Sequence, residues 1–104
     1  MVAGTNFIQY LAEWQKDMKS KGKCFPLVTT RRDIKEQYQK EGVIVWHYSE
    51  LKHQKKPSGL ILDQSFSSPV RQSFVKKYSK HWPSVTIKRV VFDHGFELME
   101  ELEV

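Results

Sequence analysis

The sequence predicts a small α+β domain with about three helices and a mixed or antiparallel sheet, in the split β-α-β (ferredoxin-like) arrangement. Its 104 residues suffice for one hydrophobic core, so we expect a single domain over residues 1–104. Stretches with a helical apolar period alternate with short β-branched runs, which favours this class. A winged-helix-like arrangement is the alternative, with residues 30–41 as its recognition helix and residues 52–56 in its wing.

The first predicted helix begins at Thr5, whose hydroxyl can cap it, and ends near Gly22. Its apolar residues follow a 3.6-residue period: Phe7, Ile8, Leu11, Trp14 and Met18. Residues 24–28 then form a short apolar segment in which Pro26 removes one ladder hydrogen bond. We therefore expect an edge strand or an extended connection there, with the Cys24 thiol in the core.

The second helix is predicted over residues 30–41, because Thr29 or Thr30 can cap it and Thr30 with Asp33 forms a pair resembling a capping box. Residues 43–48, VIVWHY, are rich in β-branched and aromatic residues, and residues 60–66, LILDQSF, begin with an apolar run, so that each predicts a strand. The polar stretch between them ends in a Pro-Ser-Gly turn signal. These features predict a hairpin with a long basic loop.

The third helix has the best-defined bounds. Ser68 is a good N-cap and Pro69 suits the first helical position, while Pro83 ends the helix after Trp82. An apolar stripe is expected to face the core, and a basic face is expected to remain in water. The stripe consists of Val70, Phe74, Val75, Tyr78 and Trp82.

A strand is predicted to follow over residues 85–92, and a turn with Gly95 reverses the chain into a last strand. We expect an antiparallel pair in which Phe92 faces Phe96 and Lys88 faces Glu100. A short helix is the alternative for the final segment.

Charge is distributed unevenly along the chain. Residues 1–51 carry eight Lys or Arg and six Asp or Glu, residues 52–92 carry nine and one, and residues 93–104 carry none and five. The three net charges are therefore +2, +8 and −5, which sum to the formal +5. The basic middle segment predicts an anionic partner, and the acidic C-terminal segment 93–104 could mask it.

No catalytic or cofactor motif is present in the sequence. It contains no GxSxG elbow, phosphate-binding glycine loop or dinucleotide fingerprint. Its four histidines match no metal-ligand spacing: His47, His53, His81 and His94. We therefore predict no cofactor, no metal site and no catalytic residue. A metal-dependent nuclease is the least favoured hypothesis, because Asp63 is the sole carboxylate of the basic segment, residues 52–92.

The first functional hypothesis is that the domain binds DNA or RNA by neutralising phosphates. Tyr48, His53 or His81 could add stacking on bases. The predicted binding residues come from the second helix, the loop, the third helix and the strand after it: Arg31, Arg32, Lys35, Lys52, Lys55, Lys56, Arg71, Lys76, Lys77, Lys80, Lys88 and Arg89.

The alternative is a protein-interaction or regulatory module that docks an acidic partner or self-associates through its oppositely charged segments. No apolar run approaches the roughly 20 residues of a membrane span, and the N-terminus lacks the layout of a signal peptide. We therefore expect no membrane partner. The single cysteine agrees with an intracellular protein, cytoplasmic or, in a eukaryote, nuclear.

Overall fold

The structure, a computed structural model, describes the backbone of residues 3–93 and 96–101 and the side chains of residues 7–90. Its elements are, in chain order, α1 (Ala3–Ser20), β1 (Leu27–Thr29), α2 (Arg32–Lys40), β2 (Val45–His47), the 3-10 helix η1 (Tyr48–His53), β3 (Gly59–Leu62), α3 (Ser68–His81), β4 (Thr86–Asp93) and β5 (Phe96–Glu101). Helices and strands thus alternate through most of the chain, which is the connectivity that parallel sheets require.

The five strands form one sheet in the order β2-β1-β3-β4-β5. β1 pairs in parallel with β2 and β3, and β3 pairs in parallel with β4, whereas β5 runs antiparallel to β4. Four parallel strands in the order 2-1-3-4, with helices on both faces, form the doubly wound arrangement of Rossmann-like and flavodoxin-like domains. The predictions of a ferredoxin-like sheet and of a winged helix are therefore both wrong.

The error arises in the segment between β2 and β3, which was expected to be a hairpin loop. Residues 48–58 instead contain η1 and carry the chain over one face of the sheet, so that β1 lies between β2 and β3. Every residue of β1 and β3 is buried. Strands covered on both faces are typical of a parallel sheet between two helical layers, and continuous apolar runs such as residues 60–62 are their signature.

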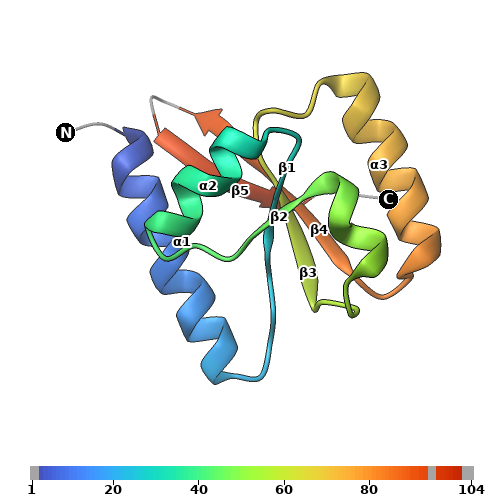
Figure 1. Ribbon diagram of the computed structural model, residues 1–104, viewed down its shortest axis with the longest axis horizontal. Coiled ribbons are helices and arrows are strands. Elements are labelled where there is room, and N and C mark those ends of the chain that lie inside the picture. The colour runs from blue at the N-terminus through green and yellow to red at the C-terminus, as the bar shows by residue number, and fades with distance from the viewer. Residues whose placement is uncertain (1–2, 94–95, 102–104) are drawn as a thin grey trace.

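Helices cover both faces of the sheet, α1 and α2 on one and η1 and α3 on the other (Figure 1). From the β1–β3 pair the chain runs outward in opposite directions, through α2 to β2 and through α3 to β4. Right-handed crossovers in opposite directions place their helices on opposite faces.

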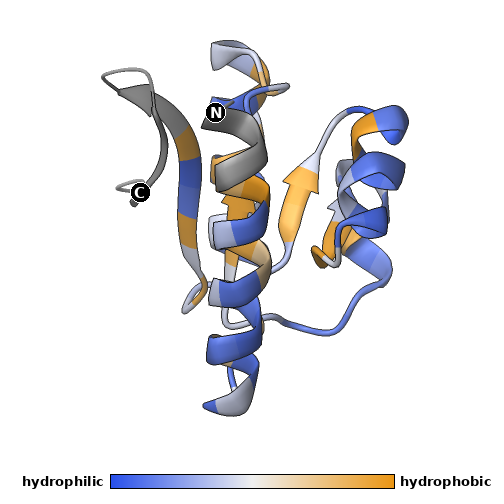
Figure 2. Ribbon diagram, turned by 90° about the vertical axis from the view of Figure 1, so that its left-hand side faces the viewer, coloured by the Kyte–Doolittle hydropathy of each residue, from blue (hydrophilic) through white to orange (hydrophobic). Residues whose placement is uncertain are grey.

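The core is divided accordingly into two clusters. Leu11, Leu27 and Ile61 lie in the cluster under α1 and α2, while Leu60 and Phe74 lie in the cluster under α3. In Figure 2, which looks onto α1, the strands behind the helix carry the hydrophobic colour and much of the outer helix surface is hydrophilic.

α1 packs one face on the sheet, as its apolar period predicts, and buries Phe7 and Leu11. The sequence does not predict the burial of Gln15. Its amide accepts a hydrogen bond from the Ile44 N–H (2.8 Å) and donates to the carbonyls of Phe25 (2.9 Å) and Ile44 (3.1 Å). A satisfied buried amide therefore ties α1 to the segments that lead into β1 and β2.

α3 confirms the predicted third helix closely. Its N-cap is Ser67 rather than Ser68, Pro69 lies in its first turn, and the chain leaves the helix at Trp82, just before Pro83. The start is shifted by one residue because the backbone of Ser67 has the extended conformation of an N-cap. The side chain of Ser67 makes no capping hydrogen bond.

The apolar stripe of α3 packs as predicted, with one exception. Phe74, Tyr78 and Trp82 are buried, and Val75 packs against the same cluster. Val70, predicted to face the core, is 42% exposed. This residue lies in the first turn of the helix.

The first half of the chain departs from its predicted caps and strand positions. α1 begins before Thr5, although Gly22 follows its end with a positive φ of 78° as predicted. β1 is an interior strand rather than an edge strand, because Pro26 precedes it and withholds no ladder donor from Leu27–Thr29. Cys24 is exposed rather than buried in the core. α2 follows the N-cap Arg31, and no side chain caps it.

β5 confirms a strand at residues 96–101, antiparallel to β4, with a register one residue away from the predicted one. Asp93 faces Phe96, and Lys88 faces Glu101. Because Asp93 still belongs to β4, two residues rather than three separate the strands, which shifts every pair by one. The predicted turn residue Gly95 lies outside the described residues.

Within the described chain, no helix combines the length and apolar character needed to cross a membrane.

Candidate functional site

The carboxyl ends of the parallel strands meet at one edge of the sheet, where β1 ends at Thr29, β2 at His47 and β3 at Leu62. In doubly wound folds, ligands bind outside this edge at the point where the strand order reverses, which here lies between β1 and β3. The side chains that follow these strands are therefore the first candidates for a site.

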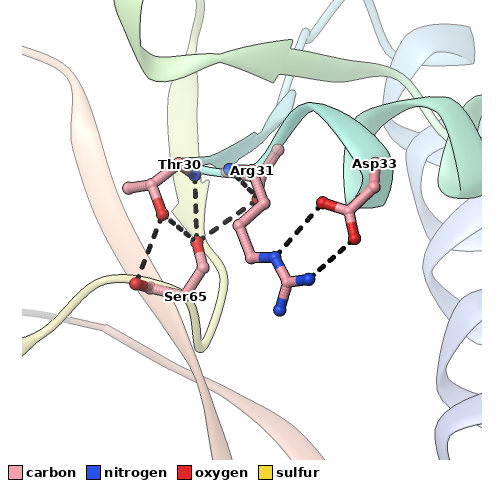
Figure 3. A network of polar contacts seen from close by, with 5 residues as sticks. Thr30, Arg31, Asp33 and Ser65 are labelled. Carbon is pink, nitrogen blue, oxygen red and sulfur yellow. Dashed lines mark hydrogen bonds and ion pairs between the residues drawn. The ribbon is translucent and has the colours of Figure 1, made fainter.

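A hydroxyl network joins the ends of β1 and β3 (Figure 3). The Oγ of Ser65 accepts a hydrogen bond from the Thr30 N–H (2.9 Å) and lies 2.8 Å from Thr30 Oγ1. It also bonds a carboxylate oxygen of Asp63, which accepts a second bond from the Ser65 N–H (3.0 Å). A hydroxyl has one donor and two acceptor positions, so that of Ser65 is fully used in holding the strand ends together.

His47 ties the end of β2 to the same edge. Its Nε2 lies 3.2 Å from the carbonyl oxygen of Thr30, and its Nδ1 lies 2.6 Å from the hydroxyl of Ser49. Because a carbonyl can only accept, Nε2 carries the proton and Nδ1 accepts from Ser49. Both ring nitrogens of this buried histidine are therefore hydrogen-bonded within the protein.

Cations at the start of α2 are paired with carboxylates. Arg31 makes two hydrogen bonds to Asp33, 3.2 Å from Nε and 2.8 Å from Nη2, which lowers the pKa of that carboxyl. Lys35 forms an ion pair with Glu50 of η1, and its hydrogen bond lowers the pKa of Glu50 against the opposing effect of burial. The charges of Arg31 and Lys35 are therefore neutralised by carboxylates of the protein itself.

A cavity of 260 Å³ opens at the carboxyl edge on the α1/α2 face. Its lining combines polar and apolar side chains: Phe7, Leu27, Arg31, Ile34, Tyr38, Asp63, Gln64, Ser65 and Val90. Three of its polar side chains are already hydrogen-bonded within the protein, because Arg31 bonds Asp33 and Asp63 bonds Ser65.

A larger groove of 520 Å³ lies between η1 and the first half of α3, and we call it the η1/α3 groove. Tyr48 and Lys52 of η1 contribute to one side, and Val70 and Lys77 of α3 contribute to the other. Its full lining is Tyr48, Ser49, Lys52, Pro69, Val70, Ser73, Phe74, Lys77 and Tyr78. Among these described residues there is no carboxylate.

Aromatic side chains form much of the η1/α3 groove. Phe74 and Tyr78 are buried, with ring centroids 4.5 Å apart, and burial raises the pKa of Tyr78. Lys77 holds its ammonium group 5.4 Å from the Tyr78 ring centroid. Tyr48, which was predicted as a stacking residue, is 41% exposed. The groove thus joins exposed aromatic surface to positive charge.

The basic face of α3 continues from this groove. Lys76, Lys77 and Lys80, the α3 lysine row, are exposed and lie three, four and seven residues after Ser73. This spacing places all four side chains along one side of the helix, over a length of roughly 10 Å. Ser73 was not among the predicted binding residues. Its helical spacing from the three lysines is the signal in the sequence that could have identified it as a groove residue.

The remaining predicted cations lie outside the groove. Lys55 and Lys56 are exposed in the segment after η1, where Lys56 bonds the hydroxyl of Ser84, and Arg32 is exposed on α2. Arg71 is half-buried on α3. The structure therefore brings Lys52 together with the α3 lysine row, and it leaves Arg31, Arg32 and Lys35 on the helix that covers the opposite face.

Lys88 and Arg89 are adjacent and half-buried on β4, an interior strand. Successive residues of a strand alternate between faces. Ile87 belongs to the cluster under α3 and Val90 to the cluster under α1, so Arg89 points to the α3 face and Lys88 to the α1 face. These two cations cannot contribute to a single surface.

Within the described part of the chain, no three His, Cys, Asp or Glu side chains are grouped as metal ligands would be. Compared with models of known families, with curated proteins and with solved structures, the chain matches none. The η1/α3 groove and its lysines are therefore the features on which a function can be argued.

Proposed function

We propose that the domain binds nucleic acid on the surface formed by η1 and α3, through phosphate neutralisation by Lys52 and the α3 lysine row. The observation that carries the proposal is the meeting of Lys52 and Lys77 in one groove, with Lys76 and Lys80 continuing along the same side of α3. These lysines come from two segments that are remote in sequence.

The lysines in question are available to an external anion. Among the described residues, the ion pairs involve Lys16, Lys21, Arg31 and Lys35, and none involves Lys52 or the α3 lysine row. An unpaired, solvated ammonium group can displace a condensed counterion from a phosphate without first breaking an internal pair. The sequence supports the same view, since residues 52–92 carry nine cations and one carboxylate.

The proposal sets an expected salt dependence. If Lys52, Lys76, Lys77 and Lys80 each cover one phosphate, the slope of log K against log[salt] is about −2.8 for a single strand and about −3.6 for a duplex. Fluorescence anisotropy of a labelled single strand and of its duplex, between about 50 and 200 mM salt, measures this slope.

Two double variants test which lysines give rise to the slope of log K against log[salt]. Lys76→Gln/Lys77→Gln removes two charges from the α3 lysine row and should make the single-strand slope shallower by about 1.4. Lys19→Gln/Lys40→Gln removes two exposed charges from α1 and α2, on the other face. This control should leave the slope within error of wild type.

Two results contradict the proposal. The first is a wild-type chain that binds neither oligonucleotide at low salt. The second is an equal change in slope for both double variants, which would attribute binding to net charge alone. Retained binding to polyglutamate without oligonucleotide binding would favour instead the acidic protein partner, since the same lysines suit both polyanions.

A further inference from the structure

Tyr48 is the exposed aromatic residue of the η1/α3 groove. It begins η1 immediately after β2, so the sheet fixes its position. Its ring centroid lies 4.9 Å from that of His47 and 6.3 Å from that of Phe66, with interplanar angles of 62° and 83°. A ring held by two aromatic neighbours and still 41% exposed is a preformed stacking surface.

The opposite side of the groove is also exposed and apolar. Val70, 42% exposed, and Pro69 line the same 520 Å³ volume. Planar heteroaromatic groups favour such a site, because their faces pack on apolar and aromatic surface. Ser49 and Ser73 line the groove as well. The Ser49 hydroxyl donates to His47 and can still accept a hydrogen bond from the polar edge of a ring, whereas the Ser73 hydroxyl can donate or accept.

Lysines flank this stacking surface from two directions. Lys52 follows Tyr48 by four residues on η1, and Lys77 follows Val70 by seven on α3, and both line the groove. Aromatic side chains between cations are the combination with which proteins hold single strands: bases stack and phosphates are neutralised. A carboxylate would oppose this, and none is present among the described lining residues.

We infer that the η1/α3 groove binds an unpaired base of single-stranded nucleic acid, stacked on Tyr48, with neighbouring phosphates bound by Lys52 and Lys77. The inference rests on the proposed function and narrows it from nucleic acid in general to single strands. In a duplex the faces of each base are covered by its neighbours, so Tyr48 can stack there only if a base is first extruded.

Substitutions at Tyr48 test the inference with a single strand and a hairpin duplex as probes. Tyr48→Ala should weaken single-strand binding by roughly 5- to 100-fold, because stacking on one aromatic ring is typically of that size, and should change duplex binding by less than about 2-fold. Tyr48→Phe should bind like wild type, since stacking does not need the hydroxyl. Tyr10→Ala removes a 52% exposed tyrosine from α1 and is the matched control.

Two further variants keep the test decisive if Tyr48→Ala does not fold. Tyr48→Trp should bind single strands at least as well as wild type and show indole fluorescence quenching on binding. Val70→Glu places a carboxylate in the groove at an exposed position and should weaken single-strand binding by 10-fold or more.

The outcomes separate the inference from the proposed function. Equal losses on single strand and duplex, or unchanged binding in both Tyr48→Ala and Val70→Glu, would overturn the stacking site. The proposed function would still stand if the Lys76→Gln/Lys77→Gln variant had the shallower salt slope. Absence of wild-type binding to both probes would overturn both.

Discussion

Replacement of Ser65 by alanine tests the way in which the strand ends are held together. The hydroxyl of Ser65 accepts the Thr30 N–H at 2.9 Å, lies 2.8 Å from Thr30 Oγ1 and bonds the carboxylate of Asp63. Ser65→Ala removes these contacts, together with one of 3.3 Å to Thr29 Oγ1, and leaves the part-buried Thr30 N–H without its acceptor. An unsatisfied donor costs about 1 to 3 kcal/mol, and a bond to a charged group contributes about 1.5 to 3 kcal/mol.

The expected loss is smaller than the sum of these terms. Asp63 and Ser65 are only half-buried, so water can replace part of the lost bonding to the carboxylate. We therefore expect the free energy of unfolding to fall by about 2 to 3 kcal/mol. For a domain of this size, this corresponds to a decrease in Tm of roughly 8 °C or more.

Urea denaturation followed by circular dichroism measures this change, with the slope m as a check that the transition remains two-state. Ser79→Ala is the matched control, because the Ser79 hydroxyl bonds only the Val75 carbonyl within α3. That substitution should change stability by less than about 0.5 kcal/mol, since alanine favours the helix. If Ser65→Ala also stays within about 0.5 kcal/mol at unchanged m, the hydroxyl does not hold the strand ends together.

Three other predictions concern single residues. Gly59→Ala should destabilise the fold by about 1 to 3 kcal/mol in urea denaturation, because the added Cβ would lie 2.8 Å from the Thr86 carbonyl oxygen; a neutral result would contradict this packing. The pKa of Glu50 lies below its ordinary value of 4.5 because of its hydrogen bond to Lys35, so its stabilising effect is present above pH 4.5 and is lost as the pH falls through the lower folded value. The stability difference between wild type and Glu50→Gln, measured by urea denaturation from pH 7 downward, should therefore shrink in acid; a constant difference would argue against the pair. The exposed Cys24 thiol should react with a disulfide reagent in the folded protein, more slowly than a small thiol because partial burial raises its pKa; reaction only after denaturation would show that it is buried.

Local signals in the sequence located the helices well. The 3.6-residue apolar period found α1 and α3, and Pro69 and Pro83 fixed the bounds of α3 to within a residue or two. The exposure of Lys76, Lys77 and Lys80 follows from the same period. These features depend on residues within a few turns of one another, which is why they can be recognised without the fold.

Strand pairing could not be obtained in the same way. The apolar runs that became β2 and β3 were found, but their separation by a polar stretch with a turn signal is compatible with both a hairpin and a crossover. The insertion of β1 between them depends on Leu27 pairing with Val45 on one side and Ile61 on the other. Such contacts reflect the burial of both sheet faces, which no local window contains.

The sequence by itself determined the positions of α1 and α3, the excess of positive charge in residues 52–92 and the acidic segment after it. Only the tertiary structure decided which cations share a surface: it brought Lys52 and Lys77 to one groove and directed Lys88 and Arg89 to opposite faces of the sheet. The physical reason is that charge is a property of composition, whereas the field at a groove depends on the distances between side chains, and the crossovers of a parallel sheet set those distances.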